Sequence, residues 1–215
     1  MFIGHFALGL AAKRAVPQMS LAMLFVAAQF ADLLWPILVA LGIEHVRIDP
    51  GNTAFTPLDF VSYPYSHSLL FLAIWGVVLG VACRAITRND RALVVLALLV
   101  VSHWVLDFVT HRPDMPLYPQ GPKVGLGLWN SVAATRLIEI GLYAAGCWIY
   151  FRSTRARDGV GRWAWLVLVG LLLVTYFAAG SQPPPSVNAL WISALVGVAV
   201  IIALSAWADR HRAPV

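Results

Sequence analysis

The sequence predicts an all-α fold, a polytopic bundle of transmembrane helices, and its composition and its apolar runs both support this. Of the 215 residues, 60% are hydrophobic and only 12% are charged, about half the charge of a soluble globular domain. The apolar residues gather in uninterrupted runs of ~20, long enough to cross a hydrocarbon core of ~30 Å. Transmembrane strands would alternate apolar and polar residues, and runs such as Ala92–Val101 do not alternate.

Six apolar runs predict six spans in a single domain that covers residues 1–215. They are Ser20–Ile43, Ser68–Ile86, Ala92–Thr110, Ser131–Phe151, Trp163–Gly180 and Asn188–Trp207. A shorter apolar segment, Phe2–Ala12, comes first and is too short to span at 1.5 Å per residue. Because the basic pair Lys13-Arg14 follows this segment, we expect a half-inserted helix that carries His5 ~12 Å deep, close to His103.

The cations predict the orientation of the bundle. One set of alternate connections holds eleven of them, Lys13, Arg14, Arg84, Arg88, Arg91, Arg152, Arg155, Arg157, Arg162, Arg210 and Arg212, and the other set holds Arg47, Arg112 and Lys123. The positive-inside rule therefore places both termini in the cytoplasm. Despite the net charge of +5, no basic stripe interleaved with aromatic residues is present, so a nucleic-acid partner is not expected.

The third predicted span carries three ionisable residues at a spacing of four. His103, Asp107 and His111 therefore share one helical face. An ionisable group inside a membrane costs ~3 kcal/mol or more at a helix centre, which makes it a functional candidate by default. Further candidates at similar depth lie on other predicted helices: His5, Asp32, His67 and Glu139.

Histidine and carboxylate side chains at this spacing predict a divalent metal site. Three arrangements are open: His103 with Asp107, Asp107 with His111, or Asp107 bridging two ions. Imidazole with carboxylate suits zinc best, with manganese or iron as alternatives. A carboxylate outside the ligand set would act as general base, and Asp32 and Glu139 are the candidates, although Asp32 is equally suited to be a ligand.

Several polar residues have plainer interpretations. Arg136 and Glu139, three residues apart, would neutralise each other, and Arg112 and Lys123 would be surface charges. Ser66 beside His67 is weak support for a serine nucleophile. The remaining loop residues are expected to be solvated: Glu44, His45, Asp49, Asp59 and Asp114. The last two predicted spans contain no acid, base or histidine, which indicates a packing role.

Four motifs in this order resemble the bacterial family of membrane-bound, inner-membrane metal-dependent hydrolases. They are Gly4-His5-Phe6, Asp32, Ser66-His67-Ser68-Leu69-Leu70 and His103-x3-Asp107-x3-His111. The resemblance implies an inner-membrane location, hydrolase chemistry and a metal-site set of His5, His67, His103 and Asp107, with Asp32 and His111 near it. The chain has Ala31-Asp32-Leu33-Leu34 where that family often has Pro-Asp-x-Asp, so it has one carboxylate fewer.

These observations lead to three functional hypotheses. The favoured one is a zinc-type metallohydrolase in the outer half of the bilayer, acting on membrane lipids or on a lipid-derived or periplasmic small molecule through an ester or phosphodiester bond. The alternative is a proton- or ion-coupled transporter, because chains of Asp, Glu and His in spans also relay protons. The third is a structural membrane protein whose polar cluster only fixes helix packing.

Overall fold

The computed structural model describes residues 1–179 and 182–215, and their architecture is mostly helical. Five helices in this part of the chain are long and apolar enough to cross a membrane. They are α5 (Leu69–Thr87), α6 (Asp90–Thr110), α7 (Val132–Ser153), α8 (Gly159–Ala179) and α9 (Val187–Arg210). The predicted all-α bundle is therefore confirmed; Gly180, the predicted end of the fifth span, lies outside the described residues.

The first predicted span, Ser20–Ile43, is broken into two helices. Helices α2 (Leu21–Ala28) and α3 (Phe30–Ala40) meet at Gln29 with a bend of 59°. In an unbroken helix the Ala28 carbonyl would accept from the Asp32 amide, but here it accepts from the ring of His103. Pro36 inside α3 also lacks the N–H that would bond to the Asp32 carbonyl. Insertion of a side chain into the helical ladder is a known cause of such kinks.

Side-chain caps fix the starts of most long helices. A serine hydroxyl accepts from the backbone amide three residues on at Ser20, Ser68, Ser131 and Ser186, and Asn89 does the same for α6. Such caps satisfy amides that have no partner within the helix, which stabilises each start by about 1 kcal/mol. The predicted span boundaries are accordingly accurate to within a few residues.

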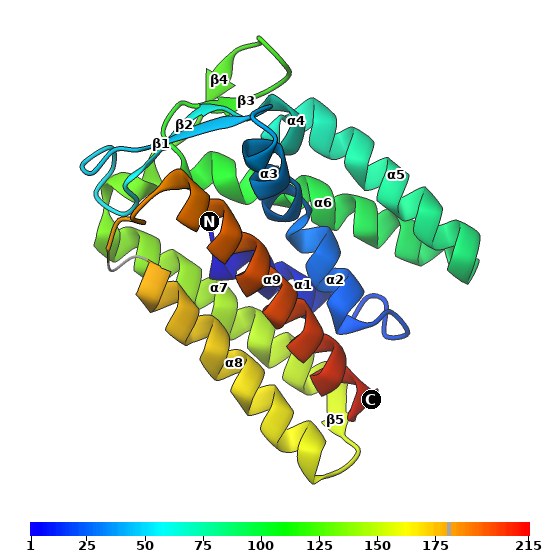
Figure 1. Cartoon of the computed structure of the whole chain (residues 1–215). Helices are drawn as coiled ribbons and strands as arrows, with labels where there is room; N and C mark the ends of the chain where they lie inside the picture. The colour runs from blue at the N-terminus through cyan, green and yellow to red at the C-terminus, as the bar shows by residue number, and fades with distance from the viewer. Residues whose placement is uncertain (180–181) are drawn as a thin grey trace.

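Helices α5 and α6 lie side by side along their length (Figure 1). Two glycines one turn apart on α5 allow this: a Cβ on Gly76 would lie 2.8 Å from the Ala97 carbonyl oxygen, and one on Gly80 would lie 2.7 Å from that of Leu93. Small residues at this spacing are typical of closely packed membrane helices. The pairing positions α6, which carries His103 and Asp107.

The two long connections predicted to face outward contain short antiparallel sheets. Strand β1 (His45–Ile48) pairs with β2 (Leu58–Ser62), followed by the single-turn helix α4 (Pro64–His67). Strand β3 (Met115–Pro116) pairs with β4 (Lys123–Val124), followed by a 3₁₀ turn at Leu128–Asn130. These pairs lie at the same end of the bundle in Figure 1. The sequence did not predict them, since their strands are too short to show periodicity.

The predicted N-terminal helix is present as α1 (Ile3–Ala12), a separate ten-residue apolar helix packed against α2, α6 and α7. At its C-terminal end, Lys13 Nζ donates to Asp209 Oδ2 of α9 over 2.8 Å and to the Met19 carbonyl over 2.7 Å. Tyr150 donates to the other oxygen of Asp209. The C-terminal end of α9 therefore anchors α1 through Asp209, so α9 has a role beyond packing against its neighbours.

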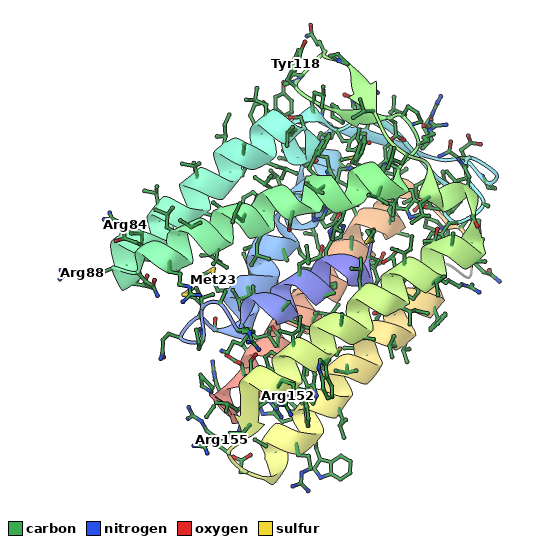
Figure 2. The ribbon with its side chains drawn as sticks, turned by 180° about the vertical axis from the view of Figure 1, so that it is seen from behind. Met23, Arg84, Arg88, Tyr118, Arg152 and Arg155 are labelled. Atoms are coloured by element: carbon green, nitrogen blue, oxygen red, sulfur yellow. The ribbon has the colours of Figure 1, made fainter. Side chains whose placement is uncertain are left out.

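A third small sheet lies at this end, formed by β5 (Thr154–Ala156) and β6 (Arg212–Pro214). Figure 2 shows Arg84, Arg88, Arg152 and Arg155 at one end of the bundle and Tyr118, in the turn between β3 and β4, at the other. The spatial separation matches the division of cations along the sequence.

We expect this separation to reflect the orientation in the membrane, with both termini in the cytoplasm. In a chain whose Cys83 and Cys147 are replaced by serine, Lys123→Cys should react with an impermeant maleimide in intact spheroplasts. Arg157→Cys should react only after the membrane is permeabilised. The reverse pattern of labelling would reverse the orientation.

Candidate metal centre

The carboxylate of Asp107 on α6 contacts two stacked histidine rings through their Nε2 atoms. The rings of His5 and His103 are parallel to within 3°, with their centroids 3.6 Å apart. His5 Nε2 lies 3.1 Å from Asp107 Oδ1, and His103 Nε2 lies 3.1 Å from Oδ2. The expectation that α1 carries His5 to His103 is confirmed, although the two residues lie far apart in the sequence.

Asp32 and His67 complete the cluster from α3 and α4. His67 Nε2 lies 3.5 Å from Asp32 Oδ1 and 3.9 Å from Asp107 Oδ2, while His103 Nε2 lies 3.7 Å from Asp32 Oδ1. Two overlapping groups could therefore hold an ion: His5 with His103 and Asp107, and Asp32 with His67 and His103. The break at Gln29 puts Asp32 in the first turn of α3, where it faces the cluster.

The hydrogen bond to Ala28 fixes the protonation pattern of His103. Its Nδ1 lies 2.9 Å from the Ala28 carbonyl oxygen, which can only accept, so Nδ1 carries the proton. In the neutral ring Nε2 then presents a lone pair. This nitrogen is completely buried and makes no hydrogen bond among the described residues, despite the 3.1 Å approach to Asp107. A lone pair facing carboxylate oxygens becomes favourable when a positive charge lies between them, either a metal ion or a second proton on the ring.

The donor set therefore fits a divalent ion. Donor atoms around a tetrahedral zinc at ~2.0–2.2 Å lie ~3.3–3.6 Å apart. The two histidine nitrogens, on His67 and His103, lie 3.1–3.9 Å from Asp32 Oδ1 and Asp107 Oδ2. Histidines of metal sites usually donate their other ring N–H to a carbonyl or carboxylate, as His103 does to Ala28.

Two further groups contact the cluster from the N-terminal segment. The Met1 amine donates to Asp107 Oδ1 and, over 3.2 Å, to Thr110 Oγ1. Glu139 Oε2 accepts from the amides of Phe2 at 2.8 Å and Gly4 at 3.3 Å, so Glu139 caps the start of α1 from α7. Its Oε1 is buried and makes no hydrogen bond with the described residues.

The interpretation that Arg136 neutralises Glu139 is wrong. Arg136 is exposed and its guanidinium lies over the ring of Phe177, 5.8 Å from the centroid. No ion pair joins it to Glu139 in the described chain. The three-residue spacing places the two side chains on neighbouring rows of α7, but Glu139 turns inward to the amides of α1.

His111 lies apart from both groups of candidate ligands. It follows the last residue of α6, and its Nδ1 lies 3.0 Å from Asp114 Oδ1 and 3.4 Å from the Tyr63 hydroxyl. Its ring packs against Trp129 at 4.2 Å between centroids. Among the arrangements open from the sequence, the pairing of His103 with Asp107 is the one that these contacts favour.

Three acids expected to be solvated are buried instead: Glu44, Asp59 and Asp114. Asp59 pairs with Arg47 and Arg112, so Arg112 is part of an ion-pair network and not an isolated surface charge. Burial acts to raise the pKa of Asp114, but hydrogen bonds from His111, Tyr63 and Arg112 hold it below its usual value. The outer connections therefore contain a network of buried polar side chains.

A cavity of about 370 Å³ opens onto the cluster, within the range typical of small-molecule sites. Its polar lining includes Asp32, His67, Asp107, His111 and Glu139. Its aromatic lining comprises Phe2, Trp35, Phe55, Phe60, Trp129 and Tyr176. Because Phe55 and Phe60 belong to the connection that holds β1 and β2, the cavity lies at the end of the bundle predicted to face outward.

Sequence comparison decides the family. A model of the YdjM inner membrane protein family matches residues 1–183. The chain belongs to this family. It is therefore a multi-pass inner membrane protein, as the resemblance implied, and all the candidate site residues lie within the matched part of this YdjM-family chain. Comparison with curated proteins and with solved structures finds no match.

Sequence reasoning missed Glu44 and the role of Ser66. Ser66 Oγ lies 2.7 Å from His67 Nδ1 and 2.6 Å from Glu44 Oε2. The adjacency of Ser66 and His67 is visible in the sequence, but by itself it suggests a serine nucleophile and not a positioning role. Glu44 gave no signal, because it lies 22 residues away in a connection that resembles an ordinary polar loop.

Proposed function

We propose that this chain is an integral membrane metal-dependent hydrolase whose divalent ion, zinc by its donor set, is held by Asp32, His67, His103 and Asp107, with His5 beside them. One observation carries the proposal. The buried Nε2 of His103 makes no hydrogen bond in the described chain, and it faces two carboxylates. The combination of imidazole and carboxylate donors favours zinc over softer or harder ions.

A divalent ion at such a site supplies Lewis acidity. The chain's own residues would supply the rest. Glu139 offers Oε1, buried in the cavity wall and free of hydrogen bonds to the described residues, as the acceptor for the proton of an attacking water. Since Asp32 lies close to two histidine nitrogens, its position supports a ligand role, and Glu139 is the better candidate for the general base.

The cavity walls support an apolar substrate. Aromatic rings and a few polar side chains line the cavity, a composition typical of small-molecule sites that are mostly apolar with few polar groups. The substrate class proposed is therefore lipid-derived, with an ester or phosphodiester bond placed at the cluster. Membrane lipids reach the outer end of the bundle without crossing the bilayer.

The proposal is tested on purified protein in detergent. We expect about one zinc per chain by elemental analysis, and metal-dependent turnover of chromogenic carboxylic esters or of bis-p-nitrophenyl phosphate. Glu139→Gln keeps an acceptor oxygen for the two amides, so it should retain zinc while turnover falls by roughly 10²–10⁴-fold. Arg136→Gln, an exposed change one turn away on α7, should behave as wild type. Wild-type protein without metal, or full turnover in Glu139→Gln, would contradict the corresponding part of the proposal.

One observation favours the second candidate, an ion-coupled transporter. The broken pair α2 and α3 and the short helix α1 resemble the interrupted helices that form transporter sites. Purified protein in liposomes would separate the two. Metal-dependent hydrolysis without ion flux supports the hydrolase, and a proton or cation flux that Asp107→Asn abolishes supports the transporter.

A further inference from the structure

We propose that Glu44 and Ser66 are positioning residues that hold His67 in the tautomer with its proton on Nδ1, so that Nε2 is free to bind a divalent ion. The predicted effect on metal binding rests on the proposed function, but the tautomer of His67 can be measured in metal-free protein.

The three residues form one hydrogen-bonded chain. Glu44 lies in the connection between α3 and β1, while Ser66 and His67 lie on α4. Glu44 Oε2 lies 2.6 Å from Ser66 Oγ, which lies 2.7 Å from His67 Nδ1. All three side chains are buried, with residue exposures of 1%, 0% and 3%. Water therefore has little access to replace a missing member of the chain.

The other oxygen of Glu44 is held by the backbone of α4. Oε1 accepts from the amide of Tyr65 at 2.8 Å and from that of Ser66 at 2.9 Å. These contacts fix the carboxylate at the start of this short helix, with Oε2 directed at the Ser66 hydroxyl. The bonds to Glu44 thus orient both the backbone that carries His67 and the hydroxyl that contacts its ring.

The direction of the hydrogen bonds follows from the number of protons. A carboxylate only accepts, so Ser66 donates its single hydroxyl proton to Glu44. The Ser66 oxygen must then accept from His67 Nδ1, which consequently carries the ring proton. His67 Nε2 is left with a lone pair, 3.5 Å from Asp32 Oδ1 and 3.9 Å from Asp107 Oδ2.

The order of the three residues distinguishes the hydrogen-bonded series Glu44–Ser66–His67 from a nucleophilic triad. In a triad the histidine lies between the acid and the serine, and it takes the serine proton. Here Ser66 lies between Glu44 and His67, so its proton is directed away from the ring. His67 and His103 thus present Nε2 to the same two carboxylates. The hydrogen bond to Ser66 fixes the ring of His67, and the hydrogen bond to the Ala28 carbonyl fixes the ring of His103.

Glu44→Gln is the sharpest test, because it should reverse the direction of the hydrogen bonds between residue 44, Ser66 and His67 while nearly keeping the side-chain volume. The glutamine oxygen accepts from the two backbone amides, and its NH₂ group then faces Ser66 and donates to it. The Ser66 proton would turn to His67 Nδ1, which moves the ring proton to Nε2. In metal-free protein, ¹⁵N-histidine spectra should show His67 protonated at Nδ1 in wild type and at Nε2 in Glu44→Gln, with His67→Gln used for assignment.

The consequence for metal is measured by titration with Zn²⁺ in detergent. Loss of such outer contacts typically weakens metal affinity 10–100-fold, and we expect this for Glu44→Gln and for Ser66→Ala. Ser68→Ala is the matched control, because Ser68 is equally buried and near His67 but caps α5 through the Phe71 amide. It should lower thermal stability and leave Zn²⁺ affinity and the His67 tautomer unchanged.

The outcomes separate this proposal from the proposed function. Wild-type His67 protonated at Nε2, or unchanged Zn²⁺ affinity in Glu44→Gln, would overturn the role of Glu44 and Ser66 while leaving a metal site intact. Wild-type protein that binds no Zn²⁺ would contradict the proposed function. The tautomer of His67 in wild type and in Glu44→Gln would still decide whether Glu44 and Ser66 position the His67 ring.

Discussion

His103→Ala is expected to weaken Zn²⁺ binding by more than about 100-fold, because changes to outer contacts alone typically cost 10–100-fold. Its Nε2 belongs to both groups that could hold an ion, so the two groups lose their shared member. Asp107→Asn should have a similar effect, since Asp107 carries a buried negative charge close to His5, His67 and His103. Affinity is measured by competition with a chromogenic chelator on purified protein.

His45→Ala provides the matched control for this experiment. His45 is an exposed histidine on β1 and belongs to neither group of candidate ligands, so its removal should leave Zn²⁺ affinity unchanged. Because His103→Ala also leaves the Ala28 carbonyl without its donor, each variant is checked for monodispersity and helical content. A well-folded His103→Ala protein with wild-type Zn²⁺ affinity would contradict the assignment of the cluster as a metal site.

The helices were predictable because the physical signal for them is local. Long apolar runs and a capping Ser or Asn before four of the five long helices fix α5, α6, α7 and α9 within a few residues. The bend at Gln29 was not predictable, because the apolar run continues through it. At the break the Ala28 carbonyl bonds to the ring of His103, which lies 75 residues after Ala28, and Pro36 removes a second hydrogen bond from α3.

The core of the cluster was predictable for the same local reason. Spacing of four along one helix brings His103 and Asp107 together, and depth in the bilayer brought in His5, Asp32 and His67. His111 illustrates the limit of this argument. The helix ends at Thr110, shortly before Pro113, and a residue preceding proline is disfavoured in helical conformation. The His111 side chain therefore leaves the shared face and contacts Asp114.

The buried acids of the outer connections were not predictable at all. Glu44, Asp59 and Asp114 stand in segments rich in proline and glycine, which usually indicate solvated loops. Their burial depends on partners that lie far away in the sequence: Ser66 for Glu44, Arg112 for Asp59, and Tyr63 for Asp114. Pairings of this kind depend on how the loops pack against one another, and loop packing leaves no periodic pattern in the sequence.

Gly146→Ala is expected to displace α1 from α7 and thereby to damage the cluster from a distance. A Cβ at Gly146 would lie 2.5 Å from the Ala7 carbonyl oxygen and 2.7 Å from its Cα. Both contacts are with backbone, so no flexible side chain can relieve them and the helices must separate. Ala7 lies two residues after His5, whose ring stacks on His103. We therefore expect Zn²⁺ affinity to fall by about 10-fold or more, and overpacking to cost about 1–3 kcal/mol of stability.

Gly141→Ala is the matched control on the same helix. An added Cβ at this exposed position meets nothing within 4 Å, and alanine is favoured over glycine in a helix by about 1 kcal/mol. Gly141→Ala should therefore keep wild-type Zn²⁺ affinity and equal or exceed wild-type thermal stability. A larger residue, in Gly146→Leu, should deepen both losses if close approach of α1 is the cause. If Gly146→Ala and Gly141→Ala gave the same affinity and the same unfolding temperature, the position of α1 would not depend on this contact. The packing of α1 against α7 would then not be what holds His5 at the cluster.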